Sequence, residues 1–120
     1  MTASTTKSRK AKARALQNAI ASDICAAFPV LGSADVHPAI MGQSGMDICL
    51  SSRARDLFPY AIECKNQEAV SIWSAIAQAK ANGEKEGLVP LLVFKRNRTA
   101  PYVIIQWDLF LHLLTPRGAA

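Results

Sequence analysis

The sequence predicts a single α/β domain built around a mixed sheet. Its 120 residues are enough for one hydrophobic core and too few for two, and half of them are hydrophobic. Segments with helical and strand-like patterns follow one another in the order α-β-β-β-α-β-β-α, which is that of a mixed α/β sandwich. The strand–helix–strand step from Tyr60 to Phe94 implies a right-handed parallel crossover.

The first helix is expected from Ala11 to Ala27. Leu16, Ile20 and Ile24 recur there at helical spacing among many alanines. Phe28-Pro29 ends this helix, because the residue before a proline is pushed out of the helical region. Residues 1–10 are polar and basic, and we expect them to form a disordered arm ahead of a single domain at 11–114.

Three strands are expected in the next part of the chain. The first is weak and contains Pro38, which indicates an edge position because proline cannot donate to a ladder. The second directly follows a Gly-rich turn, and a polar loop or short helical turn at 51–57 separates it from the third. The three predicted strands are residues 34–40, 46–50 and 60–65.

The second half of the chain begins with a helix expected from Glu68 to Ala81, with Val70, Trp73 and Ile76 at helical spacing. Asn82-Gly83 is expected to stop it and to leave 84–87 as a charged loop. Further along, the pattern predicts a buried strand at 89–94, a strand at 102–106, a short closing helix at 107–114 and a tail at 115–120.

The net charge favours an acidic partner such as nucleic acid. It is +5, with an isoelectric point near 9.4. The positive charges that precede the first acid, Asp23, account for this excess, so the rest of the chain sums to about zero. A basic arm on a neutral body fits DNA binding, although basic tails are also often solvated termini. These residues are Lys7, Arg9, Lys10, Lys12 and Arg14.

The cysteines and the hydropathy pattern indicate a cytoplasmic protein with no membrane partner. Cys25, Cys49 and Cys64 lie in apolar contexts without a Cys-x-x-Cys pair, as reduced core thiols do. No run approaches the roughly 18 apolar residues that a membrane span needs. His37 and His112 are isolated, and we interpret both as structural.

The strongest chemical signal is formed by Asp47, Glu63 and Lys65. In the third predicted strand, Glu63 and Lys65 are two residues apart and so point to the same face. Asp47 lies in the second predicted strand. If these two strands are neighbours, both carboxylates and the ammonium group converge.

Two carboxylates form a hard, oxygen-rich site suited to Mg²⁺ or Mn²⁺. A lysine beside them can orient or deprotonate a water, or neutralise charge on a phosphate. The alternative is a structural ion pair on a sheet face. A single salt bridge does not need two acids, however, and a buried pair rarely recovers its desolvation cost.

Gly45-x-Asp47 followed by Glu63-Cys64-Lys65 resembles the acid…(Glu/Asp)-x-Lys pattern of the PD-(D/E)xK nuclease superfamily. The resemblance covers roughly Leu16 to Leu114 and is closest to the small archaeal and phage Holliday-junction resolvases and related phage endonucleases. It implies a restriction-endonuclease-like αβββαβ core. The order of elements inferred from the hydrophobic pattern agrees with this core and adds a strand and a C-terminal helix.

The resemblance also implies roles for the motif residues. Asp47 and Glu63 would bind the metal, with the backbone carbonyl of Cys64 as another ligand, and Lys65 would position the attacking water. The implied cofactor is Mg²⁺, with Mn²⁺ able to substitute, and it would stabilise the charge that develops on the phosphate. Related nucleases often place a glutamine near the metal on the next helix, and Gln78 corresponds to it. The alternative is that Gln78 is an ordinary surface glutamine.

The first predicted helix departs from the family pattern. Many members carry an additional acid there, whereas the only acid in this helix is Asp23 and Gln17 stands where the acid is expected from spacing. Asp23 is therefore either a further metal ligand or a solvated helix residue.

Further cations are candidates for contact with DNA. Lys95, Arg96 and Arg98 crowd together at a strand end, which suggests a nearby polyanion because like charges repel. Arg53 and Arg55 could extend this surface, and such contacts recognise the phosphate backbone rather than the base sequence. The alternative is a solvated loop. Ser44 and Lys80 are weaker candidates.

Together these features predict a Mg²⁺-dependent DNA endonuclease, and the resemblance points to a structure-selective Holliday-junction resolvase. A homodimer could present two sites to a branched substrate, with an interface at the Trp73 helix or at Leu109–Leu114. We interpret Trp73 and Trp107 as core or dimer contacts. The alternatives are a nuclease of linear or single-stranded DNA in recombination or degradation, and a nucleic-acid-binding module that does not cleave.

Overall fold

The helices and strands follow the order that the hydrophobic pattern predicts, and the segment between the second and third strands is helical. The computed structural model describes residues 5–40 and 45–115. Residues 1–4 of the expected arm, Ser44 and the expected tail beyond 115 lie outside them. The elements are α1 (Thr6–Ala27), β1 (Val36–Pro38), β2 (Ile48–Leu50), α2 (Ser52–Leu57), β3 (Tyr60–Asn66), α3 (Ile72–Glu86), β4 (Val89–Lys95), β5 (Tyr102–Ile104) and α4 (Trp107–Leu114).

Helix α1 begins earlier than Ala11, the start expected from hydrophobic spacing. The side chain of Thr5 accepts a hydrogen bond from the backbone N–H of Ser8 at 3.0 Å and caps the helix. Residues 6–10 are therefore helical rather than disordered. The predicted apolar stripe is confirmed, since Leu16, Ile20 and Ile24 are buried.

Helix α3 does not stop at Asn82-Gly83, and 84–87 is not a loop, so both of these predictions were wrong. The helix continues to Glu86, and Gly87 ends it in the left-handed conformation at φ 67°. Gly83 has a different role, because a Cβ there would lie 2.7 Å from the Leu88 carbonyl oxygen and 2.8 Å from a Pro90 side-chain carbon. This glycine permits α3 to pack closely against the start of β4.

The described residues form two sheets instead of the single mixed sheet expected. Strands β1 and β2 form an antiparallel pair. The second sheet has the order β3-β4-β5, with β3 and β4 parallel and β5 antiparallel to β4. The predicted parallel crossover through α3 is thus confirmed. Strand β2 approaches β3 where the backbone N–H of Asp47 donates to the carbonyl of Ile62 at 3.0 Å.

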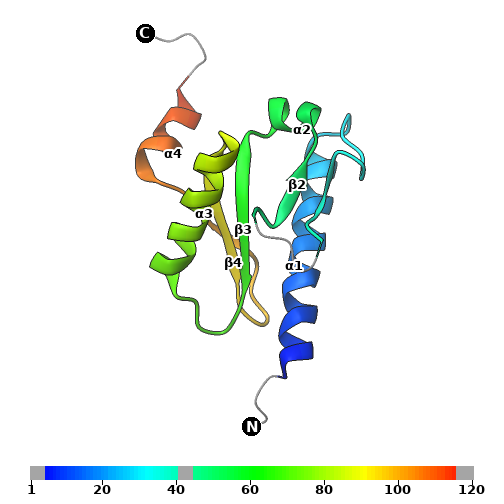
Figure 1. Ribbon diagram of the computed structural model, residues 1–120, viewed down its shortest axis with the longest axis vertical. Helices are drawn as coiled ribbons and strands as arrows, with labels where there is room; N and C mark the ends of the chain where they lie inside the picture. The colour runs from blue at the N-terminus through cyan, green and yellow to red at the C-terminus, as the bar shows by residue number, and fades with distance from the viewer. Residues whose placement is uncertain (1–4, 41–44, 116–120) are drawn as a thin grey trace.

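The three-stranded sheet separates two groups of elements (Figure 1). Helix α1 and the β1–β2 pair lie on one side, and α3 and α4 lie on the other. The main core is on the α1 side, where Ile62 and Cys64 of β3 pack with Leu16 and Ile20. Because side chains alternate along a strand, Glu63 and Lys65 point to the opposite, α3 side.

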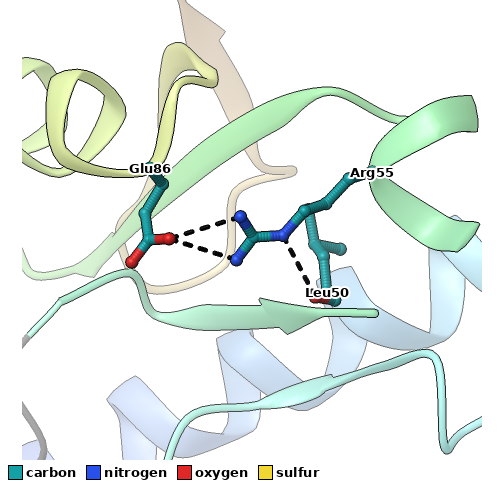
Figure 2. Close-up of polar contacts among 3 residues, drawn as sticks. All are labelled: Leu50, Arg55 and Glu86. Atoms are coloured by element: carbon teal, nitrogen blue, oxygen red, sulfur yellow. Dashed lines mark hydrogen bonds and ion pairs between the residues drawn. The ribbon is translucent and has the colours of Figure 1, made fainter. Parts of the chain in front are cut away.

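Arg55 connects α2 to the far end of α3 (Figure 2). Its guanidinium nitrogens lie 3.2 and 3.3 Å from a carboxylate oxygen of Glu86, and its Nε donates to the carbonyl of Leu50 at 3.3 Å. Arg53 donates to the carbonyl of Val30. Both arginines, which the sequence suggested as DNA contacts, therefore hold parts of the chain together.

Candidate active site

The structure brings Asp47, Glu63 and Lys65 together at the edge of β3 that faces away from β4. Asp47 directly precedes β2 and is bonded twice to β3. Its N–H donates to Ile62, and its Oδ2 accepts a hydrogen bond from the backbone N–H of Cys64 at 2.7 Å. These two bonds fix the carboxylate of Asp47 beside the strand that carries the other two residues.

Glu63 is buried in the middle of β3, with 5% of its surface exposed. The Nζ atom of Lys65 lies 3.6 Å from a carboxylate oxygen of Glu63 and forms an ion pair with it. The strand register places Leu92 beside Glu63 and Phe94 beside Lys65. The polar pair therefore has apolar neighbours on its β4 side.

The electrostatics of the site favour a bound cation. Burial, and after it the nearby charge of Asp47, raise the pKa of Glu63, while Lys65 opposes both effects, and the net result is a pKa of about 7. Burial also raises the pKa of Asp47, against the hydrogen bond from Cys64. Two carboxylates with raised pKa values lie close together, and a single lysine compensates them incompletely.

A pocket of about 660 Å³ lies over these residues, between α1 and α3. Glu63 and Lys65 line it from β3, Asp47 lines it from the residue before β2, and Gln78 lines it from α3. Helix α1 contributes Gln17, at the position where the spacing had suggested an acid. Asp23 is exposed and is not among the residues that line this pocket.

The donor set fits a hard divalent cation. Among residues 5–40 and 45–115, no group of three or more His, Cys, Asp and Glu side chains could hold a metal ion. The side chains therefore offer the carboxylates of Asp47 and Glu63. Since the N–H of Cys64 faces Asp47 at the edge of β3, its carbonyl faces the same way. Two carboxylates and a carbonyl suit Mg²⁺, which usually keeps several waters.

Asn66 is a site residue that the motif did not reveal. It follows Lys65 at the end of β3 and lines the same pocket. Its Nδ2 donates to the backbone carbonyl of Lys12 at 3.1 Å, and its Oδ1 is buried without a partner in the described parts of the chain. Asn66 thus connects α1 to the strand that carries Glu63 and Lys65. Its position directly after the motif was the only signal in the sequence.

The basic residues of α1 divide between two faces of the helix. Arg9 and Lys12 line the pocket with the carboxylates. Three others, Lys7, Lys10 and Arg14, line a separate depression on α1. Arg9 and Lys12 are therefore the basic residues of α1 that share a pocket with the two carboxylates.

Lys95, Arg96 and Arg98 lie at the end of β4 and in the following turn. The N–H of Gln67 donates to the Lys95 carbonyl at 3.1 Å, so this turn is held next to the end of β3. Arg98 has a φ of 64°, in the left-handed region. Lys80 lines a different, apolar groove between α3 and α4.

Comparison with known proteins identifies the family. A family described as "Phage putative PDDEXK endonuclease" matches residues 30–115, well over half of the chain. Neither curated proteins nor solved structures give a significant match. None of the helices within 5–40 and 45–115 is long and apolar enough to cross a membrane. The matched range includes Asp47, Glu63, Lys65 and Gln78. The chain therefore belongs to this family of phage PD-(D/E)xK endonucleases.

Proposed function

We propose that the protein is a Mg²⁺-dependent DNA endonuclease whose site is Asp47, Glu63 and Lys65, and that it resolves branched DNA such as Holliday junctions. The observation that carries the nuclease proposal is one pocket in which two carboxylates of raised pKa face a lysine, with Arg9 and Lys12 on its wall. The three free cysteines, Cys25, Cys49 and Cys64, are compatible with action in the host cytoplasm.

Each residue has a distinct part in the proposed reaction. Mg²⁺ held by Asp47, Glu63 and the Cys64 carbonyl would neutralise charge at the scissile phosphate, and Mn²⁺ could replace it. Lys65 orients the attacking water through its Nζ, and its ion pair with Glu63 keeps that nitrogen in place. The hydrogen bond from Cys64 holds the Asp47 carboxylate in a fixed direction.

Polar groups outside the motif hold the substrate and the water. Gln78 and Gln17 present side-chain amides from opposite walls of the pocket, where they can bind a water or a phosphate oxygen. Arg9 and Lys12 attract the DNA backbone without selecting a base sequence. Lys95, Arg96 and Arg98 extend the contact beyond the end of β3. Asp23, which is exposed and away from the pocket lining, is not part of the proposed ligand set.

The proposal of a homodimer rests on the apolar surface of α3 and α4. Trp73 is 81% exposed and Trp107 is 66% exposed, so neither is a core residue. Helix α4 has no buried residue, although most of its side chains are apolar. A symmetric dimer formed through this surface would present two sites to two strands, as a junction requires.

A cleavage assay tests the proposal. End-labelled four-way junction, linear duplex and single-stranded DNA are incubated with Mg²⁺ or EDTA. We expect paired nicks on the junction with wild type and Mg²⁺, and none in EDTA. Lys65→Ala should lose at least a hundredfold in rate. Lys85→Ala is the matched control, because Lys85 is an exposed lysine in the last turn of α3 and lines neither the site pocket nor the groove between α3 and α4.

The outcomes separate the alternatives. Equal cutting of all three substrates would support a nuclease without junction selectivity. Glu63→Ala should lose cleavage yet bind DNA at least as tightly as wild type, because a repulsive carboxylate leaves the phosphate site. An active Glu63→Ala variant would overturn the metal assignment. Binding without cutting under any divalent metal would indicate a non-cleaving module.

A further inference from the structure

A second pocket, of about 330 Å³, adjoins the candidate active site at the ends of β3 and β4. Gln67 and Glu68 line both pockets and so form a common wall. Phe94 and Tyr102 line its floor from β4 and β5, Val70 lines it from the segment that leads into α3, and Ile72 lines it from the start of that helix. The proposed cleavage reaction uses none of these four residues.

The strand register connects this pocket to the catalytic lysine. Lys65 pairs with Phe94, and Phe94 pairs with Tyr102, so the three side chains form one row on the α3 side of the sheet. Two strand spacings put Tyr102 roughly 10 Å from Lys65. A base that lies on Tyr102 can therefore belong to a nucleotide close to the phosphate at Lys65.

The chemistry of the pocket matches a nucleotide. Tyr102 is 63% exposed, and its ring centroid lies 6.4 Å from that of Phe94, so an aromatic surface is available for stacking. Lys95 and Arg96 lie on the wall of the same pocket. An aromatic floor with cations beside it is the usual arrangement for holding a single strand, in which bases stack and phosphates meet positive charge.

We infer that this pocket binds an unpaired base of the DNA substrate, with Tyr102 as the stacking platform and Lys95 and Arg96 on the adjoining phosphate. A base inside a duplex is covered on both faces by its neighbours, so only an unpaired base can occupy it. The inference rests on the proposed nuclease function, which brings DNA to the site. It would make DNA with an unpaired nucleotide next to the cut, including one released at a branch point, a better substrate than a continuous duplex.

Equilibrium binding in EDTA tests this inference without cleavage. The probes are a duplex with a short single-stranded gap, which carries 2-aminopurine at an unpaired position, and a continuous duplex of the same length. Tyr102→Ala should bind the gapped probe about 5- to 150-fold more weakly and should change affinity for the duplex less than about twofold. Tyr102→Phe should bind like wild type and quench the 2-aminopurine fluorescence equally.

Val103→Ala is the matched control, because Val103 is the next residue of β5, is 54% exposed and points to the opposite face. It should leave both affinities unchanged. Thermal unfolding confirms that the variants are folded. Equal weakening of both probes by Tyr102→Ala, or a Tyr102→Phe variant as weak as Tyr102→Ala, would overturn the inference. So would conversion of a dimer to a monomer by Tyr102→Ala in sedimentation, because a second copy would then be the occupant.

Cleavage of both probes with Mg²⁺ separates the two proposals. If the gapped probe is cut and Tyr102→Ala has no effect on binding, the nuclease stands and the base pocket is wrong. If nothing is cut but binding to the gap depends on Tyr102, the base pocket stands and the nuclease proposal is wrong.

Discussion

Glu63 is a buried acid whose charge the metal-free protein accommodates poorly. Its pKa is raised to about 7 from an ordinary value of 4.5, with burial as the largest cause. Between these two pH values the folded protein therefore keeps a proton that the unfolded chain releases. The stability contributed by this group is highest below the unfolded pKa and falls as pH rises toward 7.

Replacing Glu63 by glutamine should remove this pH dependence. In EDTA near pH 8, Glu63→Gln should be more stable than wild type by at most about 3 kcal/mol, and the difference should shrink toward zero near pH 4. Urea unfolding followed by circular dichroism measures it. Mg²⁺ should then stabilise wild type and have little effect on the variant. A difference that is the same at both pH values would show that the charge of Glu63 is not the cause.

At the residue scale, the sequence predicted which three residues come together but not the contacts that support them. Asp47, Glu63 and Lys65 could be identified because acids and a lysine in apolar strand patterns are unusual and because their spacing resembles a known motif. Asn66 and Arg55 could not be assigned, since their roles depend on partners far along the chain, Lys12 and Glu86. Such pairings exist only after the elements have packed.

Helix α1 presents basic residues in two directions, so their contributions to DNA binding can be separated. Arg9→Gln with Lys12→Gln should weaken binding and lower the slope of log affinity against log salt by about 2, because both residues line the site pocket. Lys7→Gln with Lys10→Gln removes the same charge from residues that line a different depression and should change the slope less. Fluorescence anisotropy over a salt series gives both slopes. Equal slopes for the two double variants would mean that DNA affinity depends on the net charge of α1 and not on which of its residues line the site pocket.

The contact between α3 and β4 depends on the absence of a side chain at Gly83. Alanine favours a helix over glycine by about 1 kcal/mol, but here its Cβ would meet the Leu88 carbonyl at 2.7 Å. Because the helix must shift, Gly83→Ala should lower stability by about 1–3 kcal/mol. The midpoint of urea unfolding measures this. Gly32→Ala is the control, since nothing lies within 4 Å of a Cβ there. A stabilised Gly83→Ala variant would show that helix propensity dominates.

At the element scale, glycine is where prediction from the sequence failed. Both Gly83 and Gly87 follow a helical pattern, and Asn82-Gly83 resembles a stop signal. The structure uses Gly87 as the cap and Gly83 for packing. Hydrophobic spacing cannot distinguish these two uses, because one depends on backbone conformation and the other on the position of β4. The start of α1 was missed for a similar reason, since its cap, Thr5, lies in a polar segment.

For the molecule as a whole, the oligomeric state is the main property to measure, because the proposed function includes a dimer. A standard interface buries roughly 800 Å² on each partner, and several large apolar side chains of α3 and α4 are exposed. Wild type should sediment as a dimer at micromolar concentration, and Trp107→Ser with Leu114→Ser should sediment as a monomer. Val30→Ser is the control, because Val30 is 57% exposed but lies beyond the end of α1. A monomeric wild type would contradict the dimer.

The overall topology was largely predictable, and its division into two sheets was not. The parallel step from β3 through α3 to β4 follows from an apolar run, a helical pattern and a second apolar run. Whether the β1–β2 pair joins the larger sheet depends on how far β2 pairs along β3. Asp47 bonds to Ile62 through its backbone but to Cys64 through its side chain. The carboxylate of Asp47 thus accepts the hydrogen bond that a backbone carbonyl would accept in a continuous ladder.

The double bonding of Asp47 to β3 also affects how the protein resists local unfolding. The same residue joins the β1–β2 pair to the larger sheet and offers a carboxylate to the pocket, so separation of the two sheets disassembles the proposed site. A ligand that binds only the assembled site makes such opening rarer in proportion to its occupancy. Protein with bound substrate would then open rarely and would resist proteases. The free protein would open more often and would be cut first where the β1–β2 pair meets β3.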